Sequence, residues 1–327
     1  MAKKRILSGM RPTGPLHLGN LHGALANWKN MQDDYECFFF IADWHALTTD
    51  YDATEPIKAN IHAVFLDWLS VGLSPEKCTL FVQSHQKEHA ELFLLLSMIT
   101  PLPWLERNPT YKEQMDQLKT RDLTTFGFLG YPVLQAADII IYKANGVPVG
   151  IDQAPHVELT REIARRFNHF YGDVFPIPDT ILTETSKVLG LDRRKMSKSY
   201  ENAIFLSDSP DEIRQKVAQM ITDPQRARKA DPGNPDICNV FSFHKLYSAE
   251  ETPPRIDSEC RKAQIGCVEC KKLMAESLIE ALAPIREKRS YYETRPEMVT
   301  EIMQTGNEHA NRVARETMKD VREAVGI

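Results

Sequence analysis

Four short apolar runs alternate with segments of helical periodicity in the first half of the chain. The runs are RILS (5–8), ECFFFIAD (36–43), CTLFVQ (78–83) and VPVG (147–150). Continuous apolar runs bounded by polar residues are typical of strands buried on both faces. Apolar residues recur at helical spacing over 21–31, 57–69, 88–99 and 153–168. This order predicts an α/β fold with a Rossmann-like, doubly wound parallel sheet, which binds ligands beyond the carboxyl ends of its strands.

The strand pattern stops after about residue 185. Three later segments, 210–221, 271–288 and 296–325, are helical in period and rich in Glu, Lys and Arg. A loop region dense in Pro, Asp and Arg, 222–238, separates the first two. We therefore expect a nucleotide-binding α/β domain over 1–185 and a C-terminal all-helical domain over 186–327.

Charge and cysteine content narrow the class of protein. A formal net charge of −5 argues against non-specific coating of nucleic acid but leaves room for a local basic patch. No apolar run reaches the roughly 18 residues that a membrane span needs, and MAKKRILSGM has too short an apolar stretch for a signal peptide. Six cysteines without such a signal indicate a reducing compartment. We expect a cytoplasmic protein without membrane contact.

The loop after the first strand reads SGMRPTGPLHLGNLHGA (8–24). A glycine-rich loop between a strand and a helix presents backbone N–H groups to an anion. Its spacing matches neither the dinucleotide fingerprint nor the P-loop. Gly19 leaves room for a base or ribose, while His17 and Asn20 can donate hydrogen bonds to a phosphate in a transition state. The alternative is that His17 and Asn20 only cap the start of the helix.

The segment KMSKS (195–199) carries two lysines among small residues, directly after Arg193 and Arg194. Such a composition suits a mobile loop whose lysines close over a polyphosphate during a reaction. The alternative is a solvated surface loop. Together, HLGN (17–20) and KMSKS resemble the signature pair of the class I aminoacyl-tRNA synthetases.

Within that class, DWHALT (43–48) and the segment 130–168 are most similar to the bacterial tryptophanyl-tRNA synthetases, over nearly the whole chain. Tyrosyl-tRNA synthetases share the fold and are the nearest alternative. The resemblance implies that ATP and L-tryptophan form tryptophanyl-adenylate and diphosphate, with Mg²⁺ shared among the phosphates. The acyl group then passes to tRNA(Trp), whose anticodon the helical domain binds. The family is homodimeric, and the apolar stretch 92–105 could supply an interface or be buried within one subunit.

The resemblance also assigns the amino-acid pocket. Asp138 would accept a hydrogen bond from the indole N–H, and its apolar neighbours predict a pocket wall rather than a helix surface. Two valines on a short strand could pack on the indole or fill the core. The other residues implied around tryptophan are His45, Tyr131, Gln135, Val147, Val149 and Gln153.

The ATP site is implied in the same way. His17 and Asn20 would stabilise charge on the α-phosphorus, and Lys195 and Lys198 charge on the departing diphosphate. Asp152 would bind ribose hydroxyls, or serve as an ordinary N-cap. The full set of implied ATP contacts is Arg11, Pro12, Thr13, Gly19, Asn20, Gly150, Ile151, Asp152, Val188, Lys195, Met196, Ser197, Lys198 and Ser199. The chain departs from commoner family residues at Arg11 (Gln), His17 (Thr) and Gln135 (Met).

Four of the six cysteines lie close together in the second half of the chain: Cys238, Cys260, Cys267 and Cys270. A C-x-x-C pair within four such residues suits Zn²⁺ or an iron–sulfur cluster, and the residues alone do not choose between them. Some bacterial members of the family carry a [4Fe–4S] cluster on cysteines of similar spacing, which favours the cluster over structural Zn²⁺. Cys37 and Cys78 lie in predicted strands, where buried thiols are usually inert.

Two other classes remain open at this point. A nucleotidylyltransferase for a small cofactor has a similar HxGx-type loop, but has no need of a basic helical domain. A non-catalytic tRNA-binding paralogue would have no use for the two lysines of KMSKS. Amino-acid-dependent exchange between ATP and pyrophosphate separates these readings.

Overall fold

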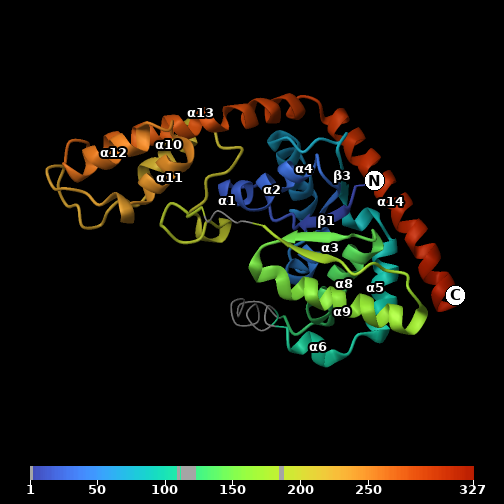
Figure 1. The fold of residues 1–327 in the computed structure, drawn as a ribbon. Helices are drawn as coiled ribbons and strands as arrows, with labels where there is room; N and C mark the ends of the chain where they lie inside the picture. Colours follow the sequence, from blue (N-terminus) through green and yellow to red (C-terminus); the bar gives the residue numbers. More distant parts are fainter. Residues whose placement is uncertain (1–2, 109–110, 112–122, 184–187) are drawn as a thin grey trace.

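The computed structural model of the chain describes residues 3–108, 111, 123–183 and 188–327. A five-stranded sheet, parallel throughout, has the strand order β3-β2-β1-β4-β5 (Figure 1). The strands are β1 (Arg5–Met10), β2 (Glu36–Ile41), β3 (Cys78–Val82), β4 (Gly146–Val149) and β5 (Asp179–Leu182). The predicted fold class is confirmed. Sequence patterning missed β5 because this short edge strand is partly exposed and has no continuous apolar run.

Helices flank the sheet, and loops connect the elements. Those before residue 185 are α1 (Leu18–Asn20), α2 (Ala26–Met31), α3 (Asp43–Asp50), α4 (Ile57–Val71), α5 (Glu88–Ile99), α6 (Leu102–Glu106), α8 (Phe126–Ile141) and α9 (Ala154–Tyr171). A π-helical turn, Leu21–Leu25, joins α1 to α2, and short 3₁₀ turns span Gln83–His85 and Ile151–Gln153. The predicted helix over 21–31 is therefore interrupted by a wider turn.

The later helices are α10 (Pro210–Gln219), α11 (Asn239–Tyr247), α12 (Thr252–Arg261), α13 (Cys267–Glu293) and α14 (Pro296–Val325), with 3₁₀ turns at Lys198–Tyr200 and Pro235–Ile237. The predicted helices 210–221, 271–288 and 296–325 are confirmed, whereas α11 and α12 carried no clear periodic signal. Among the described residues, no helix has the length and apolarity that crossing a bilayer demands.

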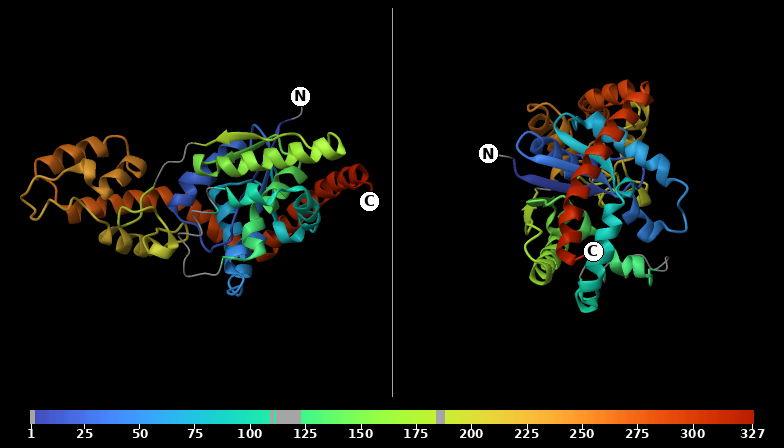
Figure 2. Two further views of the ribbon diagram at one scale, coloured as in Figure 1. Left: turned by 90° about the horizontal axis from the view of Figure 1, so that it is seen from below. Right: turned by 90° about the vertical axis from the view of Figure 1, so that its right-hand side faces the viewer.

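The two faces of the sheet pack against different helices because successive strand residues point to opposite sides. Ile6 and Phe39 lie in a core that includes α4 and continues into α10, α11 and α13. Leu7 and Phe38 lie in a second core formed with α5, α8, α9 and α14. Figures 1 and 2 show α10, α11 and α12 at one end of the molecule, joined to the α/β unit along α13. The predicted domain boundary, between residues 185 and 186, lies outside the described residues.

Helix α14 covers the β3 edge of the sheet. The Val82 N–H donates to Asn307 Oδ1 at 2.9 Å, which satisfies a backbone group that the edge would otherwise expose. Gly306 makes this approach possible, because a Cβ there would lie 1.9 Å from the Leu80 carbonyl oxygen. Helix α13 thus runs back from the end of the molecule that carries α10, α11 and α12 (the distal end), and the final helix, α14, packs along the α/β unit (Figure 1).

Candidate active site

A cavity of about 410 Å³ opens at the carboxyl ends of β1, β2 and β4. The chain runs from β1 outward to β2 and β3, and then returns to place β4 on the other side of β1. Ligands of doubly wound sheets bind at such a switch of strand order. The Phe40 ring lies against the β1 backbone, where a Cβ on Gly9 would come within 2.5 Å of it. Gly9 therefore lets the two strands form one continuous pocket floor.

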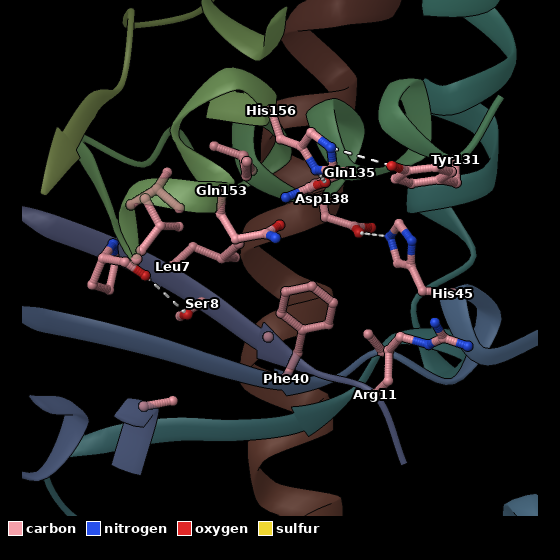
Figure 3. A pocket seen from close by; sticks show the side chains of 18 of the residues that line it. Leu7, Ser8, Arg11, Phe40, His45, Tyr131, Gln135, Asp138, Gln153 and His156 are labelled. Atoms are coloured by element: carbon pink, nitrogen blue, oxygen red, sulfur yellow. Dashed lines mark hydrogen bonds and ion pairs between the residues drawn. The ribbon is translucent and has the colours of Figure 1, made fainter. Parts of the chain in front are cut away.

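Asp138 of α8 lines this cavity, with 0% of its surface exposed (Figure 3). Its Oδ2 contacts His45 Nε2 at 2.7 Å, and its Oδ1 accepts hydrogen bonds from Gln83 Nε2 at 2.8 Å and His89 Nδ1 at 2.6 Å. Burial alone would raise the pKa of Asp138, but the hydrogen bonds from His45 and His89 outweigh it and hold the pKa at about 2. The predicted pocket-wall position is confirmed, and the helix-surface alternative is wrong.

A second network lines the same cavity. Tyr131 Oη and His156 Nε2 are 3.2 Å apart, and His156 Nδ1 and Gln135 Oε1 are 3.0 Å apart (Figure 3). Burial, followed by the charge of His45, lowers the pKa of His156 to about 4, so its imidazole is neutral at pH 7. A neutral imidazole between a phenol and an amide orients both side chains without adding charge to the pocket.

All seven residues predicted around the amino acid line this cavity: His45, Tyr131, Gln135, Asp138, Val147, Val149 and Gln153. Val147 is only 4% exposed and belongs to the core as well as to the cavity wall, so the core alternative is confirmed and packing on the indole stays a prediction. Their contacts with a ligand remain predictions. His89, Gln83 and His156 were missed, because a lone polar residue within an apolar segment gives no period from which its partner can be inferred.

The first βα loop and the KMSKS segment lie side by side. His17 forms an isolated bridge with Phe205, and the Leu18 N–H donates to the Ile204 carbonyl at 3.0 Å. Lys198 Nζ is 3.4 Å from Thr13 Oγ1. The structure therefore brings together two motifs that are about 180 positions apart in the sequence, as the signature pair requires.

The capping reading of the first motif is also correct. The His17 N–H donates to Asn20 Oδ1 at 3.0 Å, so Asn20 helps to start α1. Burial, with smaller contributions from Lys198 and Lys195, lowers the pKa of His17 to about 4. His17 is thus neutral at pH 7 and has one N–H to donate. Burial lowers the pKa of Lys198 to about 8, against the opposing charge of Asp67.

Asn202, which sequence reasoning missed, holds the KMSKS segment in shape. Its Oδ1 accepts from the Ser197 N–H at 2.8 Å, and its Nδ2 donates to Asp192 Oδ1 at 2.7 Å and to the Lys195 carbonyl at 3.2 Å. Met196 is 3% exposed and anchors the segment in the core. Lys195 itself is exposed.

The remaining predicted ATP residues occupy mixed settings. Arg11 and Gly150 line the cavity, and the Arg11 guanidinium lies 3.3 Å from Asp50 Oδ2. Asp152 is exposed and accepts from Gln153 Nε2 at 3.0 Å, so it does not cap α9. The others differ in exposure, some being buried and some exposed: Pro12, Thr13, Gly19, Ile151, Val188, Ser197 and Ser199. Their contacts with a nucleotide stay predictions.

The four later cysteines are free thiols of intermediate exposure. Cys238, Cys260 and Cys270 pack on a small core of Phe241, Ile256 and Ile265. The guanidinium of Arg226 lies 3.8 Å from Cys260 Sγ and 3.9 Å from Cys267 Sγ. Among the described residues, no group of three or more His, Cys, Asp or Glu side chains is arranged to hold a metal ion. The donor chemistry therefore suits a metal group, but the arrangement is not that of a ligated site.

The chain matches a family model over residues 2–283, described as tRNA synthetases class I (W and Y). It is 51% identical to a tryptophan–tRNA ligase of Thermotoga maritima, with 99% of both chains covered, and 47% identical to one of Aquifex aeolicus over 99% of this chain and all of that one. It also resembles the crystal structure of tryptophanyl-tRNA synthetase from Campylobacter jejuni complexed with ADP and tryptophan. That structure superimposes with a TM-score of 0.91 at 34% identity, covering 99% of this chain and 100% of that one.

Proposed function

The chain belongs to the class I tRNA synthetases of the tryptophan and tyrosine type, and we propose that the cavity around Asp138 selects L-tryptophan while the two signature loops handle ATP. The activity is tryptophan–tRNA ligation, since full-length relatives at 47% and 51% identity are tryptophan–tRNA ligases. Family membership removes the nucleotidylyltransferase reading. The buried carboxylate of Asp138 is the observation that carries the substrate assignment.

The first step needs no protein acid or base. The tryptophan carboxylate attacks the α-phosphorus of ATP, an O–P bond forms, and the bond from the α-phosphorus to the bridging oxygen breaks with loss of diphosphate. The ribose hydroxyl at the end of tRNA(Trp) then attacks the acyl carbon and AMP leaves. The enzyme contributes positioning and charge stabilisation. Mg²⁺ arrives with the ATP phosphates and offsets their charge.

Recognition of the amino acid rests on an acceptor fixed in advance. Three donors hold the Asp138 carboxylate at 2.6–2.8 Å, which leaves lone-pair capacity on oxygens that line the cavity. A ring without an N–H would close the site over these oxygens and leave their remaining acceptor capacity unmet. His45, Gln153 and Tyr131 supply polar groups for the ammonium and carboxylate, and Val147 and Val149 supply apolar surface.

On the phosphate side, neutral His17 and Asn20 donate to the α-phosphoryl group, while Lys195 and Lys198 meet the diphosphate. The adjacency of the two loops supports this assignment. The ATP ribose and base would lie along Gly19, Gly150, Ile151 and Asp152. The other predicted residues, Arg11, Pro12, Thr13, Val188, Met196, Ser197 and Ser199, shape the loops that surround the nucleotide.

Amino-acid-dependent exchange between ATP and labelled pyrophosphate tests the proposal. Tryptophan is expected to support exchange, and tyrosine is expected to give none above background. Exchange with tyrosine alone would contradict the pocket assignment. Absence of exchange with every amino acid would favour the non-catalytic paralogue.

We also propose that Cys238, Cys260, Cys267 and Cys270 hold a [4Fe–4S] cluster, with structural Zn²⁺ as the alternative. Arg226 beside two of the sulfurs suits a thiolate set of net negative charge. Such a group would brace the distal helices, and aminoacylation requires no electron from it. Iron and sulfide analysis after anaerobic purification decides between the two metals, and zinc in a colourless protein would remove the cluster.

We further propose that the chain binds the tRNA anticodon, forms a homodimer and acts in the cytoplasm. Exposed basic residues near the cysteines, Arg228, Lys229 and Lys272, support anticodon binding by the distal helices.

Homodimerisation is supported by an apolar surface on and beside α5, where Leu94, Met98 and Leu102 are 55%, 70% and 58% exposed. Six free thiols support a cytoplasmic location. Light scattering of the purified protein tests the dimer.

A further inference from the structure

Asp67 of α4 is a second fully buried carboxylate, with 0% of its surface exposed. It interrupts the apolar run FLDWLSV (65–71). Its Oδ2 accepts a hydrogen bond from the Leu16 N–H at 2.8 Å, and its Oδ1 pairs with Arg289 of α13. It therefore joins three segments: the first βα loop, α4 and the helix that leads to the distal end.

The contact with Leu16 falls directly before His17. On the other side of Leu16, its carbonyl accepts from the Leu206 N–H at 2.9 Å, so both backbone groups of this residue are held. A buried backbone N–H needs an acceptor, and an apolar residue at position 67 would leave this one without its observed partner. Asp67 thus fixes the backbone that aims His17.

The charge of Asp67 is also coupled to that of Lys198 in the KMSKS segment. Burial raises the pKa of Asp67 to about 6, while the charges of Arg289 and Lys198 oppose that rise. Arg289 is 13% exposed in its side chain and also donates to Glu293 Oε1 at 2.9 Å. Asp67 is therefore mostly ionised at pH 7, with Arg289 as its fixed partner.

A buried ion pair is seldom the most stable solution, since apolar residues of similar volume are often neutral or stabilising replacements. We propose that Asp67 is a positioning residue for adenylate formation, which holds the Leu16–His17 backbone in place and is itself held by Arg289 of α13. This inference rests on the proposed function. It assigns to α13 a part in shaping the phosphate side of the active site.

The test removes the Asp67–Arg289 ion pair and compares kcat and KM of the variant with those of the wild type in the pyrophosphate-exchange assay. The double variant Asp67→Leu/Arg289→Met leaves no unpaired charge buried but removes the acceptor of the Leu16 N–H, so it is expected to fold with a modestly lowered thermal stability. We expect its kcat for adenylate formation to fall about tenfold or more, because a small displacement of a positioned group is costly, while the KM for tryptophan stays within about twofold. A purely structural role would lower the active fraction but leave the kcat per active site unchanged.

The matched control is Glu91→Leu/Arg322→Met, which removes a bidentate pair between α5 and α14 at 2.5 and 2.7 Å. Its kcat is expected to equal that of the wild type. Equal kcat in both double variants would overturn the inference, and so would parallel losses in kcat and tryptophan affinity. If the wild type itself gave no exchange, the proposed function would fail, and not this inference alone.

Single variants at Arg289 give a second test, which leaves Asp67 in place as the acceptor of the Leu16 N–H. Arg289→Lys keeps a cation beside Asp67 and is expected to retain at least about half of the wild-type kcat, whereas Arg289→Met loses about fivefold. The same kcat in both single variants would contradict the positioning role.

Discussion

The two halves of the active site differ in how firmly their charged groups are held. On the amino-acid side, Asp138 is fully buried and has three hydrogen-bond contacts of 2.8 Å or less. On the phosphate side, Lys195 is exposed and Lys198 has a longer contact of 3.4 Å with Thr13. Under the proposed assignment, the group that discriminates between rings is preorganised, whereas the side chains that meet the charge of the phosphates are less constrained.

The difference in constraint between the two sides follows from the chemical task of each. A specificity group must not rearrange to satisfy a wrong substrate, so its partners fix it in advance. A group that accelerates the reaction must bind more tightly as charge develops than it does in the ground state. Cations with weak contacts in the free enzyme meet that requirement.

The largest expected effect is on the phosphate side. Lys195→Ala and Lys198→Ala are each expected to lower kcat for adenylate formation by about 10²–10³-fold, because each removes a stabilising charge in the transition state. The KM for tryptophan should change little, and steady-state pyrophosphate exchange measures both constants. Arg194→Ala is the control, since this cation pairs with Asp192, and it should cost less than about threefold. Wild-type rates in both lysine variants would show that the loops do not handle phosphate.

The second largest expected effect is on binding of the indole ring by Asp138. An analogue in which sulfur replaces the indole N–H is expected to bind the wild type about 10- to 100-fold more weakly than tryptophan, because Asp138 would be left with an unmet acceptor. Asp138→Asn should reduce this ratio by about tenfold, as measured by competitive calorimetry. Asp43→Asn is the control: this acid is also buried, but it accepts from the Trp44 and Ser84 N–H groups outside the cavity. An unchanged ratio in Asp138→Asn would place the indole N–H elsewhere.

A smaller effect is expected from pH. The pKa of Lys198 is lowered to about 8, so its positive charge is present below that pH and is lost as the pH rises through it. One pH unit above the pKa, about a tenth of the molecules keep the charge, and kcat/KM for ATP should be roughly tenfold lower. Thr13, His17, Lys195 and Asp67 surround this amine.

The Lys198→Arg variant sharpens the pH prediction. A guanidinium stays protonated throughout the accessible range, so the alkaline fall should move above about pH 10. The pH profile of kcat/KM for ATP is compared between the two proteins. A fall at the same pH in both would mean that another group titrates.

The smallest expected effect comes from the four later cysteines, which lie far from both halves of the active site. Cys267→Ser should remove bound metal, as measured by iron and sulfide content, yet change kcat for pyrophosphate exchange by less than about twofold, because the cysteines lie on the distal helices (Figure 1). Aminoacylation of tRNA(Trp) should suffer more. A loss of exchange as large as that of the lysine variants would tie the cysteines to the chemical step.

Four of the five strands and the burial of Asp138 were predictable, whereas β5 and the supporting contacts were not. Buried strands such as Cys78–Val82 read as continuous apolar runs, and the apolar neighbours of Asp138 indicated its burial. Asp67 carried a comparable signal, a single acid within an apolar helix, but its partners Leu16 and Arg289 lie 51 and 222 positions away. No period or spacing predicts such contacts.

The cysteines mark another limit. Their spacing predicted four thiols near one another, and three of them, Cys238, Cys260 and Cys270, pack on one small core, while Cys267 shares a contact with Arg226. Ligand geometry depends on side-chain rotamers and on the metal itself, because metal binding and local folding are coupled. Spacing therefore predicts the donor set but not the arranged site.

A crystal structure with a non-hydrolysable tryptophanyl-adenylate analogue tests the central division of the site most directly. We predict that the indole nitrogen lies about 3 Å from a carboxylate oxygen of Asp138. In the same structure, the group that replaces the phosphoryl should lie beside His17 and the KMSKS loop. An indole nitrogen bonded elsewhere, or a phosphoryl position away from both loops, would contradict the account.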